Sequence, residues 1–161
     1  MNDGILFSEL LDYNEEETRR WKQFFAQHPE ALDLPLDIAG DVRKLIVHIF
    51  AVELYFADLL ARNIDKIRDA EDGAPQGTDE FFAIGERAAQ RYKEFVAQAT
   101  PEDWSAKIEL GRVGISASKR KLITQAMTHS MRHWAQISTY LRQQGFKQDW
   151  KHDFLLSPAM E

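Results

Sequence analysis

The sequence predicts an all-α protein with the architecture of a four-helix bundle. Four segments of roughly 20 residues carry apolar side chains at the 3.6-residue period of an amphipathic helix, whereas β-type alternation is weak and confined to residues 107–115. The 161 residues, 44% hydrophobic and 29% charged, suit one soluble globular domain spanning residues 1–161. Such helices, arranged up-down with one long connection between the third and the fourth, bury their apolar faces against one another as a bundle.

The first predicted helix covers residues 8–27, and Pro29 ends it. The second begins at residue 38 or 41 and ends near residue 63. Apolar residues surround almost the whole of this second helix, because Val47, Phe50 and Leu54 lie away from its main apolar face. A helix of this kind is either central in a bundle or part of an interface, so we expect a homodimer.

The third predicted helix begins near residue 78, after the turn-rich segment 71–79, and continues to Pro101. An irregular or partly extended connection follows, and Ser116 or Ser118 then provides the N-cap of the fourth helix. Gly145, a residue type favoured just beyond a helix, ends it. The tail is expected to pack back on the bundle through Phe146, Trp150 and Phe154.

Charge and cysteine content restrict the function. A net charge of −6 and the lack of an extended basic patch argue against binding to nucleic acid. The acidic N-terminus does not resemble a secretory signal, and the most apolar run, residues 46–61, is shorter than the roughly 20 residues of a membrane span. We therefore expect a cytoplasmic protein that contacts no membrane. Because the chain has no cysteine, any metal ligand must be His, Asp or Glu.

Two histidines of the fourth helix, His129 and His133, are four residues apart, so both rings can reach the same point in space. A helical wheel places them at the margin of an apolar stripe that contains Ser130, with Trp134 near its edge. His48 lies on an apolar face of the second helix. Each histidine alone also suits ordinary core packing, but one divalent cation could satisfy three neutral imidazoles together.

A single histidine in the second helix, followed by His-x3-His in the fourth, resembles the DinB/YfiT-like family. Further stretches match that family in order: LLDYN at 10–14, LIVHIFAVELYFADLL at 45–60, ATPEDW at 99–104 and HSMRHWAQISTYLRQQG at 129–145. The chain departs from the family pattern at residues 134–135, where Trp-Ala stands in place of the Arg-Gly of many members. The resemblance implies a four-helix bundle in which His48, His129 and His133 bind a divalent metal, and it adds to the expectation of a homodimer.

Three imidazoles without a carboxylate leave a coordination position open for water or substrate. They suit nickel, iron and cobalt as well as zinc, and we expect zinc or nickel. The resemblance implies a thiol S-transferase that uses a low-molecular-weight thiol cosubstrate such as bacillithiol or mycothiol. Related members are thiol-dependent isomerases, and several are named metal-dependent hydrolases, in which the metal would activate water. The alternative is a non-catalytic metal- or ligand-binding helical dimer of a stress response.

No catalytic residue can be assigned from the sequence, but three are candidates. Glu53 could orient a ligand histidine or act as a base, although an acid on the helix flank, facing solvent or a partner chain, is the simpler interpretation. Tyr55 could form a hydrogen bond in the pocket or pack as a core aromatic, and Gln136 could hold a water at the metal. His28 and His152 are expected to be surface residues.

Overall fold

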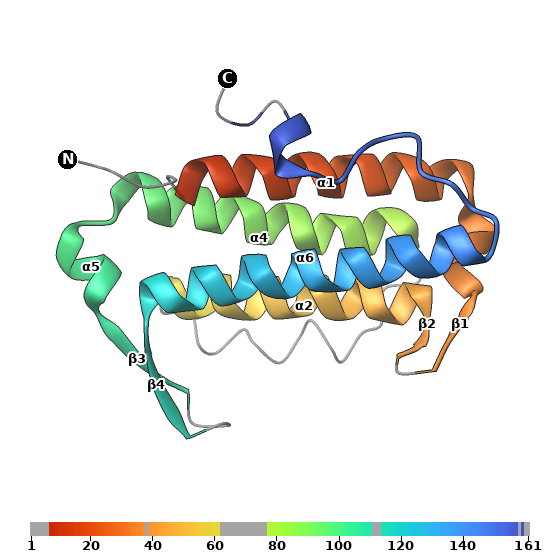
Figure 1. Ribbon diagram of the computed structural model, residues 1–161. Coiled ribbons are helices and arrows are strands. Elements are labelled where there is room, and N and C mark those ends of the chain that lie inside the picture. The colour runs from red at the N-terminus through yellow and green to blue at the C-terminus, as the bar shows by residue number, and fades with distance from the viewer. Residues whose placement is uncertain (1–6, 38, 62–76, 111–113, 158, 160–161) are drawn as a thin grey trace.

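The computed structural model describes residues 7–37, 39–61, 77–110, 114–157 and 159. Four long helices pack as a bundle: α1 (Phe7–Gln27), α2 (Val42–Leu60), α4 (Thr78–Gln98) and α6 (Lys119–Gln143) (Figure 1). Helix α2 packs against α4 and α6, and α1 closes the bundle by packing chiefly on α4. The prediction of an all-α four-helix bundle is therefore confirmed.

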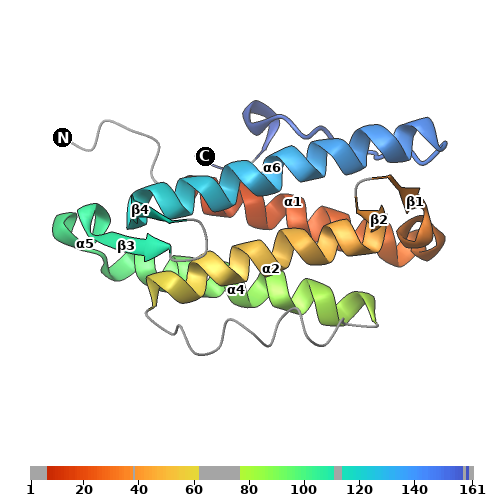
Figure 2. The same ribbon diagram turned by 90° about the horizontal axis from the view of Figure 1, so that it is seen from below.

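The four long helices do not follow the up-down alternation that the sequence predicted. Helices α1 and α6 run one way, and α2 and α4 run the other (Figures 1 and 2). Strict up-down alternation would make α2 and α4 antiparallel; instead, α2 ends and α4 begins at opposite ends of the bundle. The expected long connection before α6 contains α5 (Pro101–Ser105) and the antiparallel strands β3 (Lys107–Leu110) and β4 (Ile115–Ser118). The weak alternation near residues 107–115 therefore marks a real hairpin.

Local sequence signals set the helix ends. The Asp41 side chain accepts a hydrogen bond from the Lys44 backbone amide at the start of α2, and Ser118 does the same for Lys121 at the start of α6. Of the two serines considered, Ser118 is thus the N-cap. Gly145 follows α6 with φ +91°, a conformation that suits a residue without Cβ. Residues 38 and 63, considered as bounds of the second helix, lie outside the described residues.

A short segment at the end of the bundle joins α1 to α2. It contains the 3-10 turn η1 (Pro29–Asp33) and two paired strands, β1 (Pro35–Leu36) and β2 (Gly40–Asp41). The Tyr140 hydroxyl of α6 donates a hydrogen bond to the Pro35 carbonyl over 2.6 Å, which fixes this segment against the last helix.

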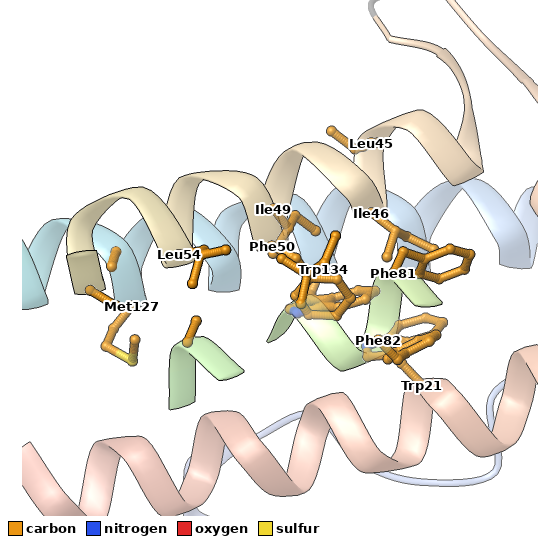
Figure 3. Packing of buried hydrophobic residues seen from close by; sticks show 14 of the residues in the cluster. Trp21, Leu45, Ile46, Ile49, Phe50, Leu54, Phe81, Phe82, Met127 and Trp134 are labelled. Carbon is orange, nitrogen blue, oxygen red and sulfur yellow. The ribbon is translucent and has the colours of Figure 1, made fainter. Parts of the chain in front are cut away.

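Helix α2 is the centre of the core. Phe50 and Leu54 are buried there, and Figure 3 shows Phe50 near Phe82 and Trp134. A Cβ atom on Gly85 of α4 would lie 2.5 Å from the Phe50 ring, so glycine permits this packing. The apolar residues that suggested an interface therefore serve largely inside the bundle, and the homodimer stays a prediction. No helix in the described part of the chain is long and apolar enough to span a membrane.

The tail packs on α1 and α6, as the sequence predicted. Phe146 and Trp150 pack against the core, and the Phe154 ring, in the 3-10 turn η3 (Phe154–Leu156), lies 5.2 Å from that of Tyr13. The Tyr13 hydroxyl donates a hydrogen bond to the His152 carbonyl. Tail and first helix are thus held together by both apolar and polar contacts.

Candidate metal centre

The three predicted histidines converge where α2 packs on α6. His48 comes from α2, and His129 and His133 come from adjacent turns of α6. One ring nitrogen of each lies within 4.8 Å of those of the other two, and the His129 and His133 Nε2 atoms are 3.1 Å apart. We call these three residues the histidine cluster. Among the residues that the structure describes, no other group of His, Asp and Glu comes together in this way.

The spacing of the histidine cluster fits a small divalent cation. With metal–nitrogen bonds of about 2.0–2.1 Å, tetrahedral geometry separates the ligand nitrogens by about 3.4 Å. The His129–His133 distance of 3.1 Å is close to that value, and the His48 nitrogen lies within 4.8 Å of both. The cluster contains no carboxylate from the described residues, so its donors are all imidazoles.

Exposure differs strongly among the three rings. His129 is buried, His133 is half-buried and His48 is exposed, so the cluster is open to solvent on the α2 side. The sequence places His48 on an apolar face of its helix, but the structure leaves this residue exposed. Burial, aided by His133 and His48, lowers the pKa of His129 from 6.5 to about 4. The ring is therefore neutral at pH 7, which is the form that binds metals.

Gln136 fixes the orientation of one ring. Its Oε1 atom lies 2.6 Å from His133 Nδ1 and can only accept, so Nδ1 carries the proton and the Nε2 lone pair faces the cluster. Gln136 thus touches the ring itself, a contact that the sequence did not predict. His129 Nδ1 is buried and has no hydrogen-bond partner among the described residues. That ring is held by packing, with its Nε2 atom directed at His133.

Glu53 is not a flank residue facing solvent, as the simpler interpretation of the sequence had it. It is 3% exposed, and its Oε1 atom accepts hydrogen bonds from Asn14 Nδ2 at 3.0 Å and Ser130 Oγ at 2.5 Å. Burial raises its pKa from 4.5 to about 7, against the opposing effect of these two bonds. The sequence did not predict either hydrogen-bond partner of Glu53. The position of Ser130, a polar residue within an apolar stripe, could have indicated that its hydroxyl bonds to another buried polar group.

The remaining assignments from sequence concern Tyr55, His152 and His28. Tyr55 packs its ring on Phe56, with centroids 5.3 Å apart, and borders the core, which agrees with its interpretation as a core aromatic. His152 is not the surface residue that we expected, because its Nδ1 atom lies 2.7 Å from Glu17 Oε2 and its ring stacks on Trp21. His28 is more exposed, and its ring contacts Phe24.

The fold and site together define a helical bundle with a histidine triad that could hold a metal ion. The chain belongs to the DinB family, whose sequence model matches residues 1–157. The crystal structure of a DinB-like protein from Bacillus subtilis superposes with a TM-score of 0.61 at 15% identity, covering 90% of this chain and 99% of that one. At that identity the similarity concerns the fold alone. No curated protein matches the chain.

Trp134, where the chain departs from the family pattern noted above, has a structural role. It is buried and stacks on Trp21 of α1, with ring centroids 5.1 Å apart and planes within 10°. The indole therefore joins α6 to α1 one residue after His133. An arginine could not fill this apolar position without burying a charge.

Proposed function

We propose that this protein is a metal-dependent enzyme of the DinB family that transfers a low-molecular-weight thiol to an electrophile. The observation that carries the proposal is the convergence of three imidazole nitrogens without a carboxylate. Such a donor set would hold one divalent ion, zinc or nickel, with a position left for an exchangeable ligand. When bound, the ion would lower the pKa of a thiol or water that reaches it.

The residues around the site have separable tasks in this proposal. Burial keeps His129 neutral, and Gln136 holds His133 in the tautomer whose Nε2 lone pair faces the cluster. The exposed His48 lies on the open side, where a cosubstrate would enter. Arg132 on α6 is exposed and could meet a negatively charged thiol cosubstrate.

Thiol transfer is compatible with a chain that has no cysteine. The sulfur comes from the cosubstrate, bonds to the electrophilic carbon and displaces the leaving group, while the thiol proton passes to solvent. Bacillithiol and mycothiol are the thiols that the family resemblance suggests. A hydrolase would place water where the thiol lies, and the same three histidines would serve it.

Metal content is the first test. Protein purified with a histidine-free tag and without chelator should carry about one zinc or nickel per chain by elemental analysis. His129→Ala should abolish that content, whereas His28→Ala, which changes a histidine outside the cluster, should leave it unchanged. A metal-free wild type that also takes up no zinc or nickel on titration would contradict the proposal.

Turnover is the second test. The metal-loaded protein is screened with bacillithiol, mycothiol, glutathione and cysteine against a chlorinated aromatic acceptor, and thioether formation is followed by absorbance. We expect activity with at least one thiol that disappears in His129→Ala. Metal binding without turnover of any thiol, and without ester or amide hydrolysis, would favour the alternative of a non-catalytic metal-binding protein.

A further inference from the structure

A cavity of about 300 Å³ opens between α1 and α4, away from the histidine cluster. Its walls come from these two helices, and Glu53 of α2 and Met127 of α6 contribute from the interior; Figure 3 shows the Met127 side chain directed into the bundle. Ala89 of α4 also lines the cavity, and its small side chain leaves space that a larger one would fill. The volume is at the small end of the range for ligand pockets.

Most polar groups deep in this cavity already donate their hydrogens in hydrogen bonds to other protein groups. The Thr18 hydroxyl donates to the Asn14 carbonyl at 2.9 Å, and the Tyr92 hydroxyl donates to the Glu53 carbonyl at 2.6 Å. Asn14 donates one amide hydrogen to Glu53, which leaves it with one donor and one acceptor. What the cavity offers to a ligand is therefore chiefly hydrogen-bond acceptors.

Glu53 provides the strongest of these acceptors. Both hydrogen bonds to its side chain fall on Oε1, and Oε2 accepts none from the described residues. The side chain is 97% buried, because its exposed fraction is 3%, and it lines the cavity. A buried carboxylate oxygen without a donor calls for a cation or a strong hydrogen-bond donor.

The charges at the cavity mouth do not favour an anionic ligand. Lys22 pairs with Glu86 across the two helices at 2.7 Å, and Arg19 pairs with Glu16 at 2.7 Å. Both basic residues of the lining thus already have an acidic partner, although Arg19 shares Glu16 with Arg20. Glu15 pairs in turn with Lys93, so the carboxylate of Glu53 is the charge for which the described residues provide no basic partner.

We propose that the cavity between α1 and α4 binds a small organic amine with an apolar body, whose ammonium group lies at Glu53. The ammonium donates to Oε2 of Glu53 and to the hydroxyl oxygens of Thr18 and Tyr92. The apolar body lies along Leu11, Ala89 and Met127. None of the three histidines of the cluster lines this cavity.

The test uses the full-length protein in the presence of a chelator, so that the histidine cluster binds no metal during the measurement. 2-Phenylethylamine, 2-phenylethanol and 3-phenylpropanoate are titrated separately and followed by amide ¹H–¹⁵N correlation spectra. We expect saturable shifts around Thr18 and Ala89 with the amine, and binding of the alcohol and the carboxylate weaker by about tenfold or more, since each lacks the ionic hydrogen bond to Glu53.

Two variants locate the site, and one serves as a control. Ala89→Leu fills the cavity and should abolish binding of the amine, whereas Ala83→Leu, at a half-buried alanine of α4 outside the lining, should retain it. Glu53→Gln should weaken the amine by about tenfold and leave the alcohol unchanged. If Glu53→Gln does not fold, Ala89→Leu and the ligand series still decide.

Equal affinities for amine and alcohol, unchanged amine binding in Ala89→Leu, or shifts that do not saturate with any probe would each overturn the proposal. Failure of the metal-dependent activity has no bearing on these outcomes, because the experiment is carried out without metal.

Discussion

The tail region around His152 and the histidine cluster both place histidine rings beside other polar groups. The two regions differ in how many of the ring nitrogens have hydrogen-bond partners. In the tail region, His152 has Glu17 at Nδ1 and Ser138 Oγ 3.3 Å from Nε2, and Trp150 donates to the other oxygen of Glu17. In the histidine cluster, ring nitrogens face ring nitrogens, and His129 Nδ1 has no partner among the described residues.

The difference indicates separate roles. A histidine whose two nitrogens both have partners stabilises the fold and has no coordination capacity left. Two neutral imidazole Nε2 atoms 3.1 Å apart either share one hydrogen, with one ring donating to the other, or both direct lone pairs at a common cation, for which His48 supplies a third nitrogen nearby. The variants below should therefore separate stability from metal binding, with tail variants affecting the first and cluster variants the second.

The largest effect is expected for zinc affinity in His133→Ala. Loss of a supporting group costs roughly 10- to 100-fold in affinity, and loss of the ligand itself should cost more, on the order of a thousandfold or about 4 kcal/mol. Competition with a chromophoric chelator measures this affinity. His152→Ala should bind zinc as the wild type does, and a parallel loss of affinity in that variant would erase the distinction between the two regions.

His152→Ala should lower the stability of the fold much more than His133→Ala does. Removing the ring leaves Glu17, a 5%-exposed carboxylate, with one of its two donors, and it also removes the stack on Trp21. We expect the free energy of unfolding to fall by about 3 kcal/mol in urea titrations of chelator-treated protein. His133→Ala, at a half-buried position, should lose less than about 1 kcal/mol. Equal losses in both variants would contradict the comparison.

The two buried glutamates extend the same contrast to acids. Glu17 accepts at both oxygens, whereas Glu53 accepts from the described residues at Oε1 alone, and burial raises the pKa of Glu53 from 4.5 to about 7. A pKa that is higher in the folded state favours folding while the group is protonated. The contribution of Glu53 to the free energy of unfolding is therefore complete below about pH 4.5 and is lost as the pH rises through about 7.

Glu53→Gln should remove this dependence. Relative to the variant, the wild type should lose up to about 3 kcal/mol of unfolding free energy between pH 4.5 and pH 8, from 1.36 kcal/mol per pKa unit. Urea titrations across this range, with chelator present, measure the difference between the two proteins, and Glu109→Gln at an exposed position is the control. Parallel pH profiles for wild type and Glu53→Gln would show that the buried carboxyl is not linked to folding.

The sequence predicted the four helices and their bundle well, because helix periodicity and end signals such as Ser118 and Gly145 are local properties, but it did not predict that α2 and α4 run in the same direction. It also identified the three histidines, since two of them share a helix face by spacing alone. It did not predict how deeply each side chain is buried. The exposure of His48 and the burial of Glu53 depend on which helices lie beside α2, and the neighbours of α2 are set by tertiary packing.

The smallest predicted effect concerns the contact between Gln136 and His133, which the sequence did not predict. Gln136 was one candidate for holding a water at the metal, and in the structure its Oε1 atom accepts from His133 Nδ1 at 2.6 Å. Gln136→Ala should lower zinc affinity by about tenfold, or about 1.4 kcal/mol, because the His133 ring loses its preferred tautomer and orientation. Gln136→Glu keeps an acceptor at this position and should restore affinity, whereas Gln143→Ala, an exposed change at the end of α6, should have no effect. If Gln136→Ala binds zinc as tightly as the wild type, packing alone orients the His133 ring.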